Sequence, residues 1–303
     1  MPQSIDYHAI LPELILAGTI LLVLVVDAFL SPRRRWLAMP LSLVGVIATL
    51  AATLTLLGDE RTTFGGHFVV DNFAITFKLF FLSAAIIVLA LSLRYFREGG
   101  FYQGEYYFLL LTSFLGCVLM PSSRDLLMLF IALELVSAPG FLMAGLRKSD
   151  IRSSEASLKF FLIGVLSTAV MLFGMSLIYG VTGGETGLSE IASALGTIDE
   201  GQRSLAYASI LFVVVGFAFK VSAFPFQFWA PDTYEGSPVP VAAFLAVASK
   251  AAGFAGLLQL MFVAFIGQHE VWVPIFANSS PPIRTMCGTF ISVSTLLISV
   301  GPL

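Results

Sequence analysis

Three charged side chains lie inside long apolar runs, where they could carry protons. Lys220 lies in FAFKVSAF, Lys250 lies in ASKAAGF, and Glu134 lies in LFIALELVSAPGF. A charge in the interior of a membrane is costly, and such residues usually mark an ion or proton pathway. A buried lysine with a carboxylate nearby can change between its charged and neutral forms. The three residues are therefore a candidate proton relay.

The run that contains Lys220 is followed by a predicted helix break. Pro225 has no N–H group, so it leaves the carbonyl of Val221 without its helical partner. Free carbonyls at membrane depth are tolerated only where protein or a water-filled cavity satisfies them. The stretch 217–240 therefore predicts a hydrated, ionisable interior. Pro139 has the same effect on the carbonyl of Leu135, close to Glu134.

Other charges near the apolar runs have a second interpretation. Lys159 stands at the start of a predicted span and is either a candidate bridge toward Lys220 or a side chain that reaches the membrane surface. Lys78 and Asp27 lie nearer the ends of spans, and we expect them to reach the surface or to cap a helix. Trp229 near a span end suits an anchor at the membrane interface.

Motifs of hydrolytic, redox and metal chemistry are missing from the sequence. We find no Ser/His/Asp arrangement, no HExxH and no CxxC. The three histidines lie outside the apolar runs without ligand spacing, and Cys117 and Cys287 lie within apolar runs as small core residues. The pattern therefore does not suit hydrolysis, and the cysteines and histidines predict neither a metal site nor haem ligation.

Composition places the chain in a membrane. Of its 303 residues, 57% are hydrophobic and 12% are charged, and the mean hydropathy is +0.92. Soluble proteins carry about 25% charged residues. The apolar runs are long and unbroken, which indicates membrane helices and a lipid bilayer as the surroundings. A net charge of -3 offers no basic surface for nucleic acid.

The runs predict an all-α, polytopic transmembrane helix bundle of about nine spans, each near the ~20 residues that cross the hydrocarbon core. These spans are 10–30, 36–57, 73–93, 106–121, 124–145, 158–180, 204–229, 240–266 and 284–301. Between spans four and five, PSSRD predicts a tight turn in which Ser122 or Ser123 caps the next helix. Apolar residues at helical spacing in 188–195 predict either a short amphipathic helix at the surface or a covered loop.

Lysines and arginines in the short loops predict the orientation. The loops after spans one, three and five hold eight of these residues, and the intervening loops hold four. This bias predicts an N-terminus outside the cell and odd-numbered loops in the cytoplasm. No basic region precedes the first apolar run, so we expect it to remain as an anchor.

Three segments resemble a known family. FKVSAFPFQFWAPDTYEGSPVPVAAF with the following Lys250, DLLMLFIALELVSAPGFLMAGL and EASLKFFLIGVLSTAVMLFGMSLIYGVTG are similar to the antiporter-like membrane subunits of bacterial NADH-quinone oxidoreductase (complex I), and within these to the subunit N group. The resemblance covers the chain from the first span onward. It implies the first half of an inverted-repeat antiporter-like fold.

The resemblance also implies roles. Glu134 matches the glutamate of helix five, Lys220 the lysine of the broken helix seven, and Lys250 the lysine of helix eight. The chain would be a proton-translocating subunit, with other complex I membrane subunits as partners in the bacterial inner membrane. NAD, FMN, iron–sulfur clusters and quinone would belong to those partner subunits and not to this chain.

Two departures from the family pattern accompany the resemblance. Gln227 stands where the family usually has a histidine, and glutamine cannot take up a proton at physiological pH. Family members have about fourteen helices, built as two inverted five-helix units. On this pattern 1–105 is an N-terminal three-helix membrane segment, 106–266 a five-helix proton-channel unit, and 267–303 the start of a truncated second unit. Either the chain is a truncated or split gene product, or a separate chain supplies the remaining helices.

Two other functions share these features. A subunit of a multi-subunit sodium/proton antiporter would carry the same Glu–Lys–Lys pattern, and a non-functional fragment would retain the sequence without the activity. Neighbouring genes would separate the first from a complex I subunit, since flavin and iron–sulfur subunits accompany only the latter.

Overall fold

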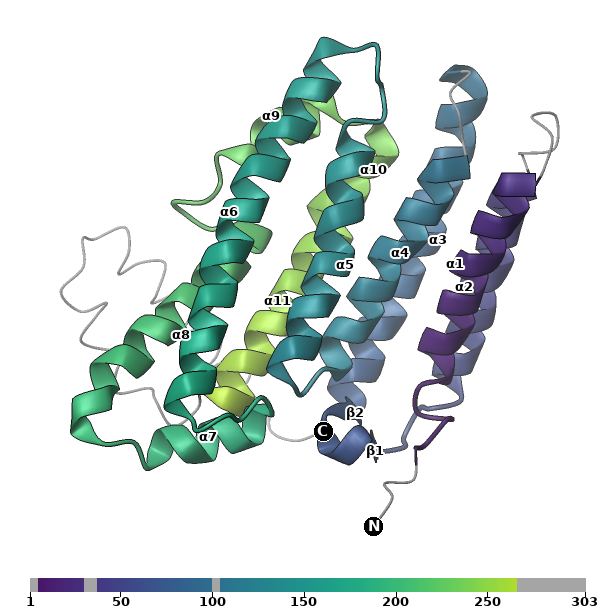
Figure 1. Ribbon diagram of the computed structural model, residues 1–303. Coiled ribbons are helices and arrows are strands. Elements are labelled where there is room, and N and C mark those ends of the chain that lie inside the picture. The colour runs from purple at the N-terminus through teal and green to yellow at the C-terminus, as the bar shows by residue number, and fades with distance from the viewer. Residues whose placement is uncertain (1–4, 30–36, 100–103, 266–303) are drawn as a thin grey trace.

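The fold is a bundle of long helices lying side by side, as the computed structural model shows for residues 5–29, 37–99 and 104–265 (Figure 1). The long helices of the bundle are α1 (Leu11–Phe29), α2 (Ala38–Leu54), α3 (Asn72–Gly99), α4 (Gly104–Leu119), α5 (Leu126–Ala144), α6 (Ile151–Val181) and α8 (Glu200–Val221). The last described stretch joins α10 (Val239–Phe244) and α11 (Lys250–Gln259) through a π-helical segment, and a second one, Leu260–Ala264, follows.

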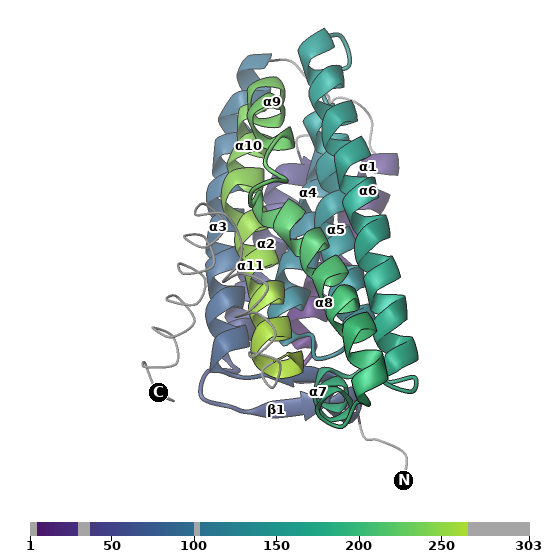
Figure 2. The same ribbon diagram turned by 90° about the vertical axis from the view of Figure 1, so that its left-hand side faces the viewer.

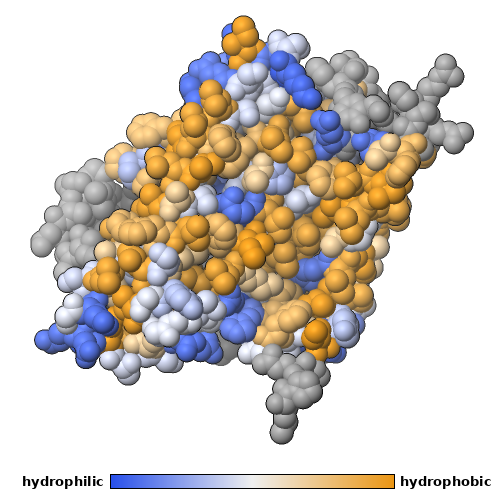
Figure 3. Space-filling model, viewed as in Figure 1, coloured by the Kyte–Doolittle hydropathy of each residue, from blue (hydrophilic) through white to orange (hydrophobic). Residues whose placement is uncertain are grey.

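Seven helical segments in the described part of the chain are long and apolar enough to cross a membrane, and the 17-residue α2 is a shorter apolar helix. Each of the first eight predicted spans coincides with one of these eight segments, and the ninth, 284–301, lies outside the described residues. The face shown in Figure 3 carries a broad apolar band between more hydrophilic ends. The largest departures from the predicted bounds are the start of α6 at Ile151 and the end of α8 at Val221.

A β-hairpin corrects the all-α prediction. Strands β1 (Arg61–Thr63) and β2 (Phe68–Val70) pair antiparallel at one end of the bundle (Figure 1). Between them, Gly65 and Gly66 have φ angles of 68° and 97°. Glycine adopts such angles without steric cost, so the FGG sequence closes the turn between β-branched strand residues.

The short helix α7 (Leu188–Gly196) lies across the same end of the bundle (Figures 1 and 2). Its residues Leu188, Ile191 and Leu195 are buried in an apolar cluster that also includes residues of α6 and α8, and α7 packs against the π-helical segment Leu260–Ala264. This confirms the amphipathic helix and excludes the irregular loop. We call this the hairpin end, and the opposite end, where α9 (Trp229–Gly236) lies, the α9 end.

The cap of α5 differs from the prediction. Asp125 occupies the N-cap position, and its Oδ1 accepts hydrogen bonds from the backbone N–H groups of Leu127 and Met128 at 2.9 and 3.1 Å. The hydroxyl of Ser123 donates instead to the carbonyl of Leu119 at 2.8 Å. A 3-10 turn over Met120–Ser122 moves the cap, and an aspartate serves there as well as a serine.

Lys78 does not reach the membrane surface as predicted. Its side chain is fully buried, and Nζ lies 2.7 Å from Oε1 of Glu13, which is also buried. The ammonium also lies 5.0 Å from the ring centroid of Phe68 in the hairpin. The hairpin covers the end of α3 that contains Lys78. This side chain therefore pairs with Glu13 inside the protein and does not reach the membrane surface.

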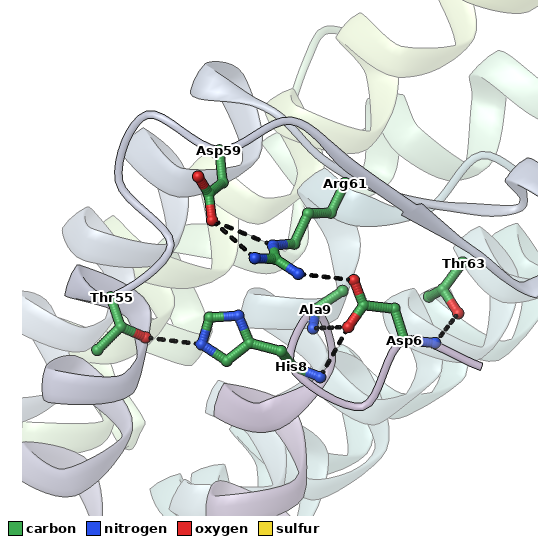
Figure 4. A network of polar contacts seen from close by, with 7 residues as sticks. All are labelled: Asp6, His8, Ala9, Thr55, Asp59, Arg61 and Thr63. Atoms are coloured by element: carbon green, nitrogen blue, oxygen red, sulfur yellow. Dashed lines mark hydrogen bonds and ion pairs between the residues drawn. The ribbon is translucent and has the colours of Figure 1, made fainter. Parts of the chain in front are cut away.

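A polar network joins the chain before α1 to the hairpin and the end of α2 (Figure 4). Asp6 accepts a hydrogen bond from Arg61 Nη1 at 3.0 Å and others from the backbone N–H groups of His8 and Ala9. The ring of His8 lies 3.3 Å from the hydroxyl of Thr55. The Arg61 guanidinium, together with these N–H groups, holds the pKa of Asp6 below its ordinary value of 3.8.

Acid should loosen this network. A carboxyl group whose pKa is lower in the folded state stabilises that state above its unfolded pKa, and the contribution is lost as the pH falls through the folded value. Below about pH 4 we therefore expect faster hydrogen exchange of the amides in 6–9 and 61–63. Asp6→Asn should exchange quickly at pH 7 and lose the acid step. Equal exchange in both proteins at every pH, after correction for intrinsic rates, would contradict this role of Asp6.

Candidate functional site

Lys220 lies in the last turn of α8, and α8 stops partway along the bundle (Figure 2). Ser222 adopts a left-handed conformation with φ 58°. The N–H of Ala223 donates to the carbonyl of Ala218 at 2.8 Å, and that of Ser222 to Phe219 at 3.0 Å. These two bonds form a Schellman motif, which satisfies carbonyls at the helix end. The irregular segment 222–228, which contains Pro225, then leads to α9.

The ammonium of Lys220 is enclosed. Its side chain is 1% exposed, and Nζ donates to the hydroxyl of Ser137 on α5 at 3.0 Å. Gly253 on α11 lies directly against it, because a Cβ at that position would come within 2.9 Å of Lys220 Cγ. The glycine lets α11 approach α8 closely, as small residues do between membrane helices. Lys220 is thus held between α5 and α11.

Glu134 lies three residues before Ser137 on α5, so both side chains lie on neighbouring parts of one helix face. The carboxylate is half-buried, and its Oε1 accepts a hydrogen bond from Thr168 of α6 at 2.9 Å. Within the described ranges no ion pair joins Glu134 to Lys220. The acid and the lysine therefore lie about one helical turn apart along α5, with Ser137 beside the lysine.

Lys250 is the first residue of α11 and follows the π-helical segment Leu245–Ser249. Such segments widen a helix locally and are frequent at functional sites. The ammonium is half-buried and lies 5.4 Å from the ring centroid of Tyr234 on α9. Burial raises the pKa of Tyr234 to about 12, so its hydroxyl keeps its proton at physiological pH.

Several hydroxyl groups on α4, on α9 and in the π-helical segment before Lys250 are buried without a hydrogen-bond partner in the protein. In the described part of the chain they include the Oγ atoms of Ser249 and Ser113 and the hydroxyl of Tyr234. Buried polar groups of this kind are usually hydrogen-bonded to internal water. Cys117 lies one turn after Ser113 on α4, and its thiol is buried 3.9 Å from the carbonyl of Ala248.

Lys159 is placed among acidic side chains. Its Nζ lies 2.6 Å from Glu155 of the same helix and 2.6 Å from Asp232 of α9. Together with Arg152 and Glu235 these residues line a polar cleft of about 260 Å³ between α6 and α9. The ammonium is therefore at the α9 end of the bundle, in contact with the helix that follows the irregular segment after Lys220.

Trp229 is not an interfacial anchor as predicted. Its ring is 1% exposed and stacks on Phe160 of α6, with ring centroids 4.4 Å apart. Its indole N–H donates to the carbonyl of Phe219 at 3.1 Å. Trp229 thus fixes the start of α9 against the turn of α8 that carries Lys220.

Ser137 and Thr168 are the site residues that sequence reasoning missed. Each supplies a hydroxyl to a charged group in the bundle interior. For Ser137 a signal was present, because it follows Glu134 by three residues on an otherwise apolar helix. Thr168 has no such signal, since its partner lies on another helix. In the described ranges no group of three His, Cys, Asp or Glu residues gathers that could hold a metal ion.

Membrane-length helices around a buried lysine and a half-buried carboxylate define a polytopic helical membrane protein with charges in its interior. The chain belongs to the NADH:quinone oxidoreductase/Mrp antiporter transmembrane family, whose model matches residues 123–296. This range includes Glu134, Lys159, Lys220 and Lys250.

Two curated relatives bear subunit N names. The chain is 42% identical to NADH-quinone oxidoreductase subunit N 2 of Streptomyces griseus over 282 residues, which cover 91% of this chain and 52% of that protein. It is 37% identical to NADH-quinone oxidoreductase subunit N of Trichlorobacter lovleyi over 270 residues, 89% of this chain and 55% of that protein. The chain spans about half the length of the curated relatives it matches.

Solved structures share the fold. A chain of respiratory complex I from Thermus thermophilus with bound aureothin is 34% identical, with a TM-score of 0.68 over 82% of this chain and 52% of that one. A chain of the Mrp complex from Dietzia sp. DQ12-45-1b is 17% identical, with a TM-score of 0.73 over 88% of this chain and 51% of that one. At that identity the second likeness concerns the fold alone.

Proposed function

We propose that this chain is part of a proton-translocating membrane subunit of an NADH-quinone oxidoreductase. Electron transfer from NADH to quinone would take place in other subunits, and the complex would act as a translocase to which this chain contributes no redox centre. The observation that carries the proposal is the enclosed ammonium of Lys220, held by Ser137 where α8 stops inside the bundle. The subunit N names of the 42% and 37% identical relatives support it.

The relay would use the break after α8. Lys220 would hold a proton while Glu134 is ionised, because opposite charges favour each other across one helical turn. When the attraction between Glu134 and Lys220 is weakened, the proton on Lys220 would pass to Lys250 through water. This water would contact Ser249, Ser113 and Tyr234, whose hydroxyl groups are buried without a hydrogen-bond partner in the protein. The interrupted helix gives such water polar backbone groups to contact, which an intact membrane helix would not offer.

Entry would occur at the α9 end. The cleft between α6 and α9 holds Lys159 between two carboxylates, and Trp229 connects α9 to the turn that carries Lys220. A proton delivered to this cleft would reach Lys220 through the segment 222–228, which includes Pro225 and the half-buried Gln227. Gln227 would contribute by hydrogen bonding to water and not by taking up the proton.

The distribution of lysine and arginine among the short loops supports an orientation of the chain in the membrane. We place the chain in a bacterial inner membrane, with the N-terminus and the hairpin end outside and the α9 end in the cytoplasm. Residues 106–266 would form the five-helix proton-channel unit, and α1 to α3 would pack beside it. The other membrane subunits of the same oxidoreductase would be its partners.

A subunit of a sodium/proton antiporter is the second candidate. The description of the matching family names the Mrp antiporter beside the oxidoreductase, and the Mrp chain has a similar fold. That chain is 17% identical, against 34% for the complex I chain. The identity therefore favours the oxidoreductase.

Glu134→Gln tests the relay. Glutamine keeps an oxygen that can accept the hydrogen bond of Thr168 but removes the charge. We expect NADH-driven acidification of inverted membrane vesicles to fall about a hundredfold, the low end of what a positioned proton-transfer group contributes. The measurement is the quenching of a pH-sensitive dye, in vesicles containing the assembled oxidoreductase with this chain.

Glu105→Gln is the matched control for this experiment. Glu105 lies at the α9 end of α4 with 59% of its side chain exposed, so the same chemical change falls outside the bundle interior. It should leave acidification unchanged. A Glu134→Gln protein that pumps as well as Glu105→Gln would remove Glu134 from the relay and leave it as a structural hydrogen-bond acceptor.

A further inference from the structure

A buried ion pair between α1 and α3 takes no part in the relay described above. Glu13 of α1 and Lys78 of α3 are 6% and 0% exposed, and Nζ lies 2.7 Å from Oε1. Beyond this contact, neither group has a hydrogen-bond partner in the described part of the chain. An ammonium has three donors and a carboxylate about four acceptor sites, so most of the hydrogen-bonding capacity of the pair is open to internal water.

Stability does not account for this pair. Apolar side chains of similar volume often stabilise a protein as well as a buried ion pair does, because both charges lose their hydration on burial. An ionisable group in a membrane interior is instead typical of an ion or proton pathway. The nitrogen and the oxygen are already in contact, within the range of roughly 2.6–3.2 Å over which a proton is transferred.

A buried apolar layer separates the pair from the hairpin end. Ala9 precedes Glu13 on the chain and Ile75 precedes Lys78, each by about one turn, and the ring centroid of Phe68 lies 5.0 Å from the ammonium. Such a layer blocks ions until water enters it. The titratable groups at that end have polar partners of their own, namely Asp6 with Arg61, His8 with Thr55, and Asp71 with Arg124.

The relay lies on the other side of α3. This helix packs against α4 and against the π-helical segment Leu245–Ser249. Ser113 of α4 and Ser249 have buried hydroxyl groups without a hydrogen-bond partner among the described residues. Lys250 follows Ser249 directly. Internal water at these hydroxyl groups gives α3 a source of protons from the relay.

We propose that Lys78 and Glu13 form a second proton-transfer site, which releases protons toward the hairpin end, and this rests on the proposed function. The ammonium of Lys78 gives a proton to the carboxylate, which leaves an amine and a carboxylic acid. The amine then takes up a proton from internal water, and the acid loses its proton to water that enters the apolar layer. The ion pair is restored, and one proton has moved outward.

Lys78→Arg tests the site, because a guanidinium keeps the ion pair but does not release its proton. In inverted vesicles with the assembled oxidoreductase, NADH-driven acidification should fall about a hundredfold, the low end for a positioned proton-transfer group. The double variant Glu13→Leu with Lys78→Met leaves no unpaired charge, so it should remain assembled on size-exclusion chromatography and lose acidification to the same extent. Lys148→Arg makes the same change on a side chain that is 85% exposed and should pump normally.

Lys220→Ala in the same vesicles separates this site from the proposed function. If Lys220→Ala stops acidification while Lys78→Arg and the double variant acidify as the wild type does, the Glu13–Lys78 pair is structural and the proposal is overturned, but the relay stands. A loss in the pair variants at full assembly supports the site.

Infrared spectroscopy of the isolated chain in detergent tests the pair without NADH or quinone. Between about pH 9 and pH 5 exposed carboxyl groups stay ionised. Over this range the spectrum of the wild type minus that of the double variant should contain the carbonyl band of a protonated carboxyl group, and this band should grow as the pH falls. A difference spectrum without the band would mean that Glu13 stays ionised, which overturns the proposal whether or not the vesicles pump.

Discussion

Replacing Lys220 with alanine is expected to abolish proton pumping while the chain still inserts into the membrane. The side chain is 1% exposed and supplies the enclosed ammonium between α5 and α11. Alanine cannot hold a proton, and Ser137 alone would be left facing the gap. Because the relay has no other charged group at this position, NADH-driven acidification of inverted vesicles should fall to the level of an uncoupled control, a loss of about a hundredfold or more.

Two comparisons make this result specific. Lys148→Ala removes a lysine whose side chain is 85% exposed at the α9 end and should pump normally. Detergent extraction and size-exclusion chromatography should show Lys220→Ala in the assembled complex, which separates a loss of pumping from a loss of assembly. Normal acidification by vesicles carrying assembled Lys220→Ala would exclude this lysine from the proton path and, with it, the proposed function of the break after α8.

Replacing either Glu13 or Lys78 with an apolar residue should strongly destabilise the protein, because the two side chains form a buried ion pair. The two groups lie 2.7 Å apart and are both buried, between α1 and α3. Breaking such a pair leaves one charge without compensation, which costs about 3–5 kcal/mol. Glu13→Leu and Lys78→Met should therefore each lower the free energy of unfolding in detergent by about this amount.

The double variant Glu13→Leu with Lys78→Met should recover most of that loss. Replacement of a buried ion pair by apolar side chains of similar volume is often neutral or stabilising. Chemical unfolding of the two single variants and the double variant forms a double-mutant cycle, and we expect a coupling energy near the cost of each single change, beyond the roughly 0.5–3 kcal/mol usual for residues in contact. Additive losses in the double variant would mean that the two side chains contribute separately.

The apolar runs in the sequence were sufficient to predict the positions of the long helices. A membrane helix is an unbroken apolar run of about 20 residues, so each of the first eight predicted spans falls on a helix of the described chain. For α7 the spacing of Leu188, Ile191 and Leu195 left a helix and a covered loop as alternatives, and the structure shows the helix. The charges of interest, Glu134 and Lys220, were visible because apolar surroundings make any ionisable residue conspicuous.

Two helix ends, the end of α8 and the start of α5, differ from those that the proline and serine positions predicted. Proline at 225 suggested an interruption, but α8 already ends at Val221 in a Schellman turn with Ser222 in the left-handed conformation. Asp125 caps α5 because a 3-10 turn shifts the helix start. Several residues near each end can satisfy the same backbone groups, so a sequence with more than one candidate does not select among them.

Sequence alone thus determined that the chain is a membrane helix bundle, where its helices run and which charges lie in apolar surroundings. Only the tertiary structure decided the partners of those charges: Lys78 with Glu13, Lys220 with Ser137, Glu134 with Thr168, and Lys159 with Asp232. The physical reason is that a helix's own pattern reports how apolar its faces are. Which face of which neighbour it meets depends on packing between segments up to 83 residues apart in the chain.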